Sequence, residues 1–324
     1  MLLPLLTVIA AFAVLVWSAD VFVAGAASIA ENLGLSPVII GLTIVSLGTS
    51  APEILVSLTA ALSGSGSLAV GNAVGSNIAN LGLVLGLTLL IAPISVHPGC
   101  LRIEVPTLLL VTAGAGILIF DLVLGRADAI LMLAALVFIL VQMIRSQSKD
   151  TDTFEHVEED ELPHLSPARA WLAFVVGLLL LVGSSKLLVW GASEIAMQLG
   201  VPELVIGLTI VAVGTSLPEL AATVASALRG HSEIAMGNVI GSNLFNLLAV
   251  MAIPGLVAPE VLPSEFLLRD YGAMSVATLA LAAMVYINSR RDESEPRASR
   301  LGRPSGFLFC VGYALYYYGL FVAH

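Results

Sequence analysis

Residues 41–62 read GLTIVSLGTSAPEILVSLTAAL, and residues 207–228 read GLTIVAVGTSLPELAATVASAL, so one polar motif recurs 166 positions further along the chain. A second pair of segments keeps the same offset, with GNAVGSNIANL at 71–81 and GNVIGSNLFNL at 237–247. Each copy of the first motif retains one glutamate, Glu53 or Glu219. Such a duplication is informative about the fold and about the site together.

The composition is that of an integral membrane protein, with 58% hydrophobic residues, 11% charged residues and a mean hydropathy of +1.01. Apolar runs recur along the chain, and each can cross roughly 30 Å of hydrocarbon as a helix. The sequence therefore predicts an all-α polytopic membrane protein with ten transmembrane helices. The predicted spans are 3–30, 36–62, 68–93, 102–119, 126–144, 169–199, 202–228, 233–258, 269–288 and 305–322.

The duplication divides the chain into a first five-helix half at 1–144 and a second at 169–324, joined by an acidic linker at 145–168. The repeated motifs occupy about 36–93 and about 202–258. An odd number of crossings in each half makes the two copies enter the membrane from opposite faces, which gives inverted repeats. We therefore expect the two motifs, each carried by a broken helix, to meet head to head at the midplane.

Basic residues predict the orientation. Alternate loops collect ten lysines and arginines on one side, against Arg126 and Arg269 on the other, with Lys186 inside the sixth span. Such an excess marks the cytoplasmic side, so we expect both termini to face outward, in a prokaryotic plasma membrane. The linker segment DTDTFEHVEEDE, which lacks the glycine turn and ligand spacing of a calcium-binding EF-hand loop, is interpreted as solvated.

The sequence lacks the residues that several enzymatic reactions require. The two cysteines are far apart, the five histidines lie in or near loops, and no HExxH helix is present, which excludes zinc proteolysis by a known motif. The sequence also has no Walker-type glycine loop, which excludes ATP hydrolysis by that motif. A membrane hydrolase using Ser50 and Glu53 would lack a histidine, lysine or second acid to complete its catalytic group. We expect no enzymatic activity, no cofactor, no nucleic acid and no obligatory protein partner.

The GTSxPE motif interrupts its own helix. Pro52 has no N–H for the carbonyl of Gly48, and Pro218 has the same effect on Gly214. A backbone oxygen freed inside a bilayer is tolerated where it lines a cavity or finds another partner, such as a cation. A carboxylate follows each proline directly, and an unpaired carboxylate at the bilayer centre costs several kcal/mol or more. We therefore interpret Glu53 and Glu219 as ion ligands.

Further oxygen ligands surround the two glutamates. Hydroxyls follow one helix face in each motif, and amides and hydroxyls recur every four residues in each partner helix. The glycines of these partner helices, at 71, 75, 237 and 241, are interpreted as packing positions. The candidate polar residues are Ser46, Thr49, Ser50, Ser57, Asn72, Ser76 and Asn80 in the first half, and Thr215, Ser216, Thr223, Asn238, Ser242 and Asn246 in the second.

A site of carboxylates, carbonyls, hydroxyls and amides suits hard cations such as Ca²⁺, and Na⁺ is of nearly the same size. Two negative charges balance one Ca²⁺ or two Na⁺, so the same residues can serve competing cargoes. The residues thus favour an antiporter that exchanges Ca²⁺ for Na⁺ by alternating access, in the direction of Ca²⁺ extrusion. Two alternatives remain open: Ca²⁺/H⁺ exchange on the same glutamates, and a passive cation channel.

The paired GTSxPE and GNxxGSNxxN segments strongly resemble the alpha-repeats of the cation/calcium exchanger superfamily, and the short loops resemble its prokaryotic sodium/calcium exchanger branch. Both repeats match in order and offset across the whole ten-span pattern. Vacuolar-type calcium/proton exchangers tend to carry asparagine and alanine before the glutamate, which GTSAPE and GTSLPE do not. The resemblance therefore implies sodium/calcium exchange.

The resemblance also implies roles. Glu53 and Glu219 would bridge a calcium site and share sodium sites with it, and the carbonyls of Thr49 and Thr215 would bind calcium. The flanking sodium sites would be lined by the side chains of Ser50, Ser76, Ser216 and Ser242 and by the carbonyls of Ser46 and Ala212. Asn80 and Asn246 would hold the central polar positions, one of which is aspartate in some relatives. Two neutral residues there leave the coupling ratio and the coupling ion open.

Asp20 and Lys186 occupy equivalent positions in the first and sixth spans, 166 residues apart. These helices resemble the pair that slides past the core in the family. Charges that reach the membrane interface from a helix end are the simpler interpretation, and a gating role is the alternative.

Overall fold

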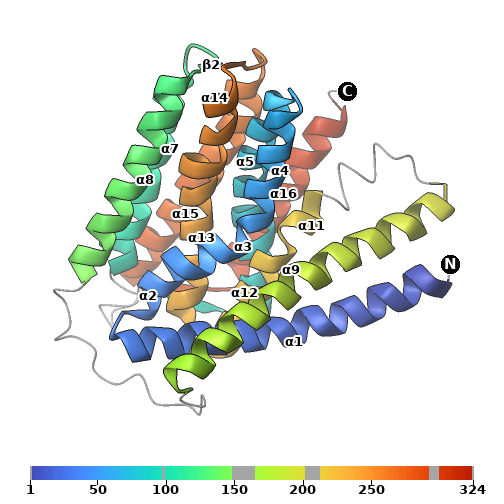
Figure 1. Cartoon of the computed structure of the whole chain (residues 1–324). Coiled ribbons are helices and arrows are strands. Elements are labelled where there is room, and N and C mark those ends of the chain that lie inside the picture. The colour runs from blue at the N-terminus through green and yellow to red at the C-terminus, as the bar shows by residue number, and fades with distance from the viewer. Residues whose placement is uncertain (1, 97–98, 148–164, 201–211, 292–298, 323–324) are drawn as a thin grey trace.

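The computed structural model of the chain describes residues 2–96, 99–147, 165–200, 212–291 and 299–322. Helices dominate it (Figure 1). The described part of each predicted span is helical, whereas most of the acidic linker, positions 201–211 of the second motif segment and part of the loop between Arg290 and Arg303 lie outside the described residues.

The first half contains a long helix, a broken helix and three further helical runs. Some turns have the wider π-helical geometry and are labelled η. The elements are α1 (Leu2–Leu33), α2 (Pro37–Ile40), η1 (Gly41–Val45), α3 (Ser46–Thr49), α4 (Ala51–Leu62), α5 (Gly66–Ala79), η2 (Asn80–Leu85), α6 (Gly86–Ile91), β1 (Ile94–Val96), η3 (Cys100–Glu104), α7 (Val105–Leu118), β2 (Val123–Leu124) and α8 (Arg126–Gln147).

The second half repeats this order within the described residues. Its elements are α9 (Pro167–Gln198), α11 (Ala212–Thr215), α12 (Leu217–Leu228), α13 (Ser232–Phe245), η6 (Asn246–Val250), α14 (Ala252–Val257), β3 (Glu260–Val261), η7 (Leu267–Tyr271), α15 (Gly272–Arg291), β4 (Ser299–Leu301) and α16 (Arg303–Val322).

Seven helices of the described residues are long and apolar enough to cross a membrane, and the bent pair Pro37–Thr49 and Ala51–Leu62 makes eight. The helix α12 is apolar but shorter. The 20-residue helix α16 is not among these helices. The chain is therefore a helical polytopic membrane protein.

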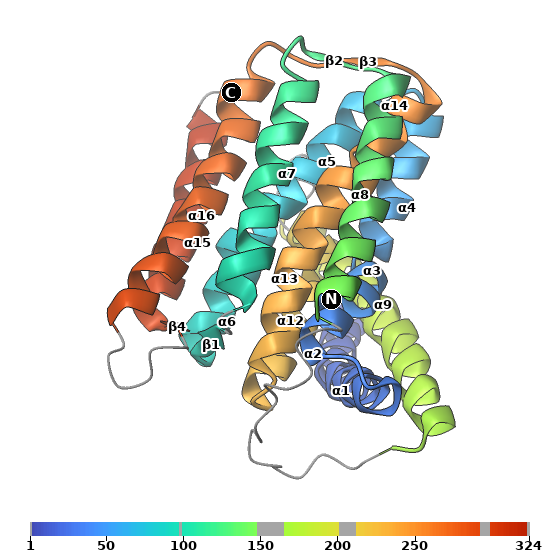
Figure 2. The same ribbon diagram turned by 90° about the vertical axis from the view of Figure 1, so that its left-hand side faces the viewer.

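Two short strand pairs close opposite ends of the bundle (Figure 2). The strand β1 pairs antiparallel with β4, which places Ser95 opposite Arg300. The strand β2 pairs antiparallel with β3 and places Leu124 opposite Glu260. Each pair joins a loop of the first half to a loop of the second, so the two halves are hydrogen-bonded to each other at both ends of the bundle.

The helices α1 and α9 pack along each other and lie obliquely to the remaining helices (Figure 1). Their contact is close because Gly25 and Gly177 let the backbones approach: a Cβ built on Gly177 would lie 2.7 Å from the Phe22 nitrogen. The rings of Phe22 and Phe174 stack at 4.8 Å beside this crossing. The two helices share one apolar cluster with residues of α2, η1, α12 and α13, and a larger cluster links most of the remaining helices.

Candidate cation site

The helix breaks predicted at the two prolines are present in the structure. The first helix bends by 45° at Ser50, whose φ and ψ of −80° and 5° leave the helical region. Ser216, between α11 and α12, has nearly the same conformation, with φ −89° and ψ 5°. In both repeats the chain restarts as a helix with proline in its first turn and with the glutamate directly after it.

One of the carbonyls that the prolines were expected to free finds a protein partner. The hydroxyl of Ser185, on α9, donates to the carbonyl of Gly214 at 2.9 Å. The equivalent position in α1 is Ala19, which has no hydroxyl. The two breaks are thus stabilised differently, although their sequences match.

Glu53 and Glu219 are both 1% exposed, and each interacts electrostatically with the other. The hydroxyl of Ser50 donates to Oε1 of Glu219 at 3.2 Å, which links the motif of one half to the carboxylate of the other. The motifs therefore meet, as the inverted arrangement predicts. Two buried like charges at such a place need a cation or a proton to be tolerated.

Asparagines of the partner helices hold the glutamates in place. Asn72 Nδ2 donates to the Glu53 carbonyl at 3.2 Å and to Ser57 Oγ at 3.0 Å. Asn238 Nδ2 makes the same two contacts in the second half, with the Glu219 carbonyl at 3.4 Å and Thr223 Oγ1 at 2.9 Å. The side chains of Asn72, Ser57, Asn238 and Thr223 were all expected to supply oxygen ligands.

Asn238 makes one further contact, with the motif of the opposite half. Its Oδ1 accepts a hydrogen bond of 3.1 Å from Thr49 Oγ1, so every polar atom of the amide already has a protein partner. The equivalent asparagine in the first half, Asn72, uses its donor group in the same way. Both asparagines therefore hold the backbone of a glutamate, and each lies 19 residues beyond the glutamate that it contacts.

The π-helical segments η2 and η6 begin at Asn80 and Asn246. A π turn is rare, widens the helix and often marks a functional position. The segment η2 packs on α12, which carries Glu219, and η6 packs on α4, which carries Glu53. Each widened turn thus contacts the glutamate-bearing helix of the opposite half, an arrangement that the sequence did not predict.

Buried polar atoms without a hydrogen-bond partner gather at the predicted ligands. Within the described part of the chain they include an oxygen of each glutamate, two hydroxyls and both central amides. An unsatisfied buried polar group costs about 1–3 kcal/mol, so a cluster of them is stable only with something bound. The atoms are Glu53 Oε2, Glu219 Oε2, Ser216 Oγ, Ser242 Oγ, and both Nδ2 and Oδ1 of Asn80 and of Asn246.

The remaining predicted ligands differ in burial and in hydrogen bonding. Ser76 is buried in α5, and Thr215 is half-buried at the end of α11. The Ser46 carbonyl already accepts from the Ser50 N–H at 2.9 Å. Ala212 is the first described residue of α11. The described residues contain no group of three or more His, Cys, Asp or Glu side chains placed to hold a metal, so a cation here would depend on hydroxyl, amide and carbonyl oxygens.

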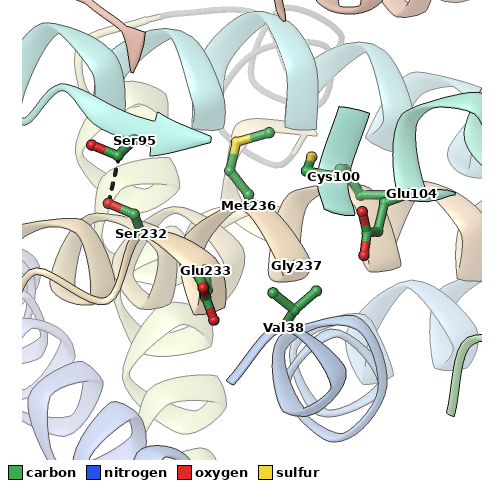
Figure 3. A pocket seen from close by; sticks show the side chains of 9 residues that line it. Val38, Ser95, Cys100, Glu104, Ser232, Glu233, Met236 and Gly237 are labelled. Atoms are coloured by element: carbon green, nitrogen blue, oxygen red, sulfur yellow. Dashed lines mark hydrogen bonds between the residues drawn. The ribbon is translucent and has the colours of Figure 1, made fainter. Parts of the chain in front are cut away.

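A third buried carboxylate, which the sequence did not single out, lies apart from this cluster. Glu104 is 1% exposed and lines a small cavity with Cys100, Glu233, Val38 and Gly237 (Figure 3). It is the last residue of η3, directly before α7.

Asp20 pairs with Arg229 at the end of α12, with Oδ1 and Nε 2.9 Å apart. The pair joins α1 to α12 and is partly exposed, at 45% for Asp20 and 33% for Arg229. Lys186 is exposed, and the position equivalent to Arg229 in the first half is the uncharged Ser63. The contact is therefore asymmetric between the halves.

Taken together, the fold and the site define a polytopic helical membrane protein with duplicated, broken helices around two buried carboxylates. A family model described as sodium/calcium exchanger protein matches residues 3–145 and 169–322. The chain belongs to the sodium/calcium exchanger family.

Individual relatives agree with this assignment. The chain is 44% identical to the putative antiporter CaxA of Alkalimonas amylolytica, over 99% of each protein. It is 36% identical to the inner membrane protein YrbG of Escherichia coli, over 98% of this chain and 96% of that protein. The solved structure of the sodium-calcium exchanger NCX_Mj soaked with zero Na⁺ and Ca²⁺ superposes with a TM-score of 0.83 at 28% identity, over 98% of this chain and 99% of that one.

Proposed function

We propose that this protein is a secondary antiporter that exchanges Ca²⁺ for Na⁺ by alternating access and that it extrudes Ca²⁺. The observation that carries the proposal is the cluster of buried oxygens without hydrogen-bond partners around Glu53 and Glu219. The site is rich in oxygen, which suits hard cations. The sodium/calcium exchangers among the similar proteins, MaX1 of Methanosarcina acetivorans and NCX_Mj, support Na⁺ as the coupling ion.

In the proposed site Glu53 and Glu219 bridge one Ca²⁺, with the carbonyls of Thr49 and Thr215 as further ligands. Flanking Na⁺ would use the side chains of Ser50, Ser76, Ser216 and Ser242 and the carbonyls of Ser46 and Ala212, while Asn80 and Asn246 line the centre. Two carboxylate charges balance one Ca²⁺ or two Na⁺, which makes the two occupancies mutually exclusive. The Ser46 carbonyl, which already accepts a hydrogen bond from the Ser50 N–H, is the weakest member of this set.

The proposed architecture is ten transmembrane helices in two inverted halves, 1–144 and 169–324, with both termini outside a prokaryotic plasma membrane. Its support is the 166-residue offset that relates Asn72, Ser57 and Glu53 to Asn238, Thr223 and Glu219 in equivalent hydrogen bonds. The strand pairs add to this, because each joins a loop of one half to a loop of the other at opposite ends. The α1 and α9 helices, which pack along each other and lie obliquely to the remaining helices, are the unit that we propose moves against them.

The test is calcium uptake into vesicles that contain the purified protein and internal Na⁺, with equal pH on both sides. We expect uptake to require internal Na⁺, and we expect Glu53→Gln and Glu219→Gln each to abolish it. A matched control is Glu265→Gln, an exposed carboxylate that should transport normally.

Each outcome separates the candidate functions. Uptake that ignores Na⁺ but follows a proton gradient would assign Ca²⁺/H⁺ exchange to the same glutamates. Calcium flux without any counter-ion would indicate a channel. Near-normal exchange in either glutamine variant would refute the proposed site.

A further inference from the structure

An apolar groove of about 550 Å³ lies between α15 and α16, the last two described helices. Figure 2 shows these helices side by side at one edge of the bundle. The helix α16 packs mainly on α6 and η2 and touches α15 at few points, which leaves the space between them open. Ile78 and Gly82, from the helix that carries Ser76 and Asn80, contribute to the lining, so the groove borders the back of the proposed site.

The dimensions of the groove match one leaflet of a bilayer. Its lining on α15 extends from Ala273 to Met284, which at 1.5 Å per residue is about 16 Å. Half of the roughly 30 Å hydrocarbon core is about 15 Å. The groove is therefore about as long as the acyl region of one leaflet.

The groove is lined by two tyrosines, Tyr313 and Tyr316, and its hydrogen-bonded polar groups lie at the Tyr316 end. Tyr316, a lining residue, donates to Asp270 Oδ1 at 2.9 Å. Arg269 donates to the same carboxylate through Nε and Nη2, at 2.9 and 3.0 Å, and its side chain remains 40% exposed. Tyrosine and arginine together are typical of the level of lipid headgroups. The exposed guanidinium offers a donor to a phosphate beside the mouth of an otherwise apolar groove.

We propose that this groove binds one acyl chain of a glycerophospholipid from the leaflet on the Arg269 side, with the phosphate against Arg269. The bound chain fills the space between α15 and α16 and holds α16 against η2. An apolar groove inside the hydrocarbon layer presents almost no partner for water, so a lipid chain is the occupant that the membrane itself supplies.

The test compares two substitutions on one helix. Ala280 lines the groove, whereas the exposed Ala283, three residues further on, does not. The purified proteins in mild detergent are mixed with dioleoyl phosphatidylglycerol, and bound lipid per chain is measured by native mass spectrometry. We expect one retained phospholipid in the unmodified protein and in Ala283→Phe, and at least tenfold less in Ala280→Phe.

Two further variants keep the proposal falsifiable. Gly312→Val narrows the groove from α16 and replaces Ala280→Phe if that variant does not elute as a single species. Arg269→Gln should reduce phospholipid retention and leave sodium-dependent calcium uptake unchanged. Retention that is equal in the groove variants and in Ala283→Phe would overturn the proposal, as would a lipid-free dimer of the unmodified protein that Ala280→Phe dissociates.

Discussion

Asn238 and Asn72 fix the backbone of each glutamate from a neighbouring helix. In the second half the amide of Asn238 also accepts from Thr49, so one side chain connects Glu219, Thr223 and the motif of the opposite half. The spacing of polar residues in the sequence predicted that these asparagines would lie beside the site. It could not predict which of them would have a protein partner at every polar atom, because that depends on the approach of helices distant in sequence.

Asn238→Ala should raise the KM for Ca²⁺ about tenfold, because losing these hydrogen bonds costs about 1.4 kcal/mol of site organisation. The measurement is calcium-dependent exchange in sodium-loaded vesicles. Asn32→Ala serves as a control, since Asn32 donates to the carbonyls of Ser28 and Leu165 away from the site. An unchanged KM in Asn238→Ala would show that Glu219 is held by other contacts.

At the scale of elements, the crossing of α13 over η1 depends on glycine. A Cβ built on Gly237 would lie 2.9 Å from the Val38 carbonyl oxygen and 3.0 Å from the Gly41 Cα. The packing interpretation is thus confirmed for Gly237, and Gly241 is equally confined by Leu42 and Ser46. For Gly71 and Gly75 no described atom lies within 4 Å of an added Cβ.

Gly237→Ala should lower the free energy of unfolding by about 1–3 kcal/mol through overpacking, seen as a lower Tm in detergent. Gly114→Ala is the matched comparison, because no described atom lies within 4 Å of its added Cβ and alanine favours a helix by up to about 1 kcal/mol. We expect opposite signs for the two variants. A stabilised Gly237→Ala would mean that α13 can move away from η1 at no cost.

The ion pair between Asp20 and Arg229 joins two helices, α1 and α12. As a partly exposed pair it should contribute about 0–1 kcal/mol, so Asp20→Asn should leave Tm unchanged. If the pair forms in only one of two transport conformations, its loss changes their ratio by up to about fivefold and alters the turnover rate accordingly. Turnover is measured at saturating ions with Asp121→Asn as control, and equal turnover in both would leave the pair a purely structural role.

For the molecule as a whole, the sequence predicted the helical membrane fold, the positions of the described helices and the approach of the two motifs. Hydropathy and the repeated motif are strong signals for these features because they depend on the local chain. The π turns at Asn80 and Asn246, the support of Gly214 by Ser185 and the burial of Glu104 were not predicted. Each depends on how one helix fits against another.

The proposed orientation makes a prediction for the whole chain. Alkaline phosphatase fused after His324 should be active, and a green fluorescent protein there should be dark, because the C-terminus is proposed to lie outside. The same two reporters fused after Arg145 should give the reverse result. Fluorescence at the C-terminal fusion would contradict the ten-span arrangement or its direction.

The paired π turns also bear on the history of the chain. A π turn holds one residue more than an α turn, and the two start at Asn80 and Asn246, which the 166-residue offset relates. A single insertion before the gene duplicated explains both more simply than two separate events at one place. The ancestral half-length segment would then already have carried the widened turn, and the duplication would have brought two such turns into one chain.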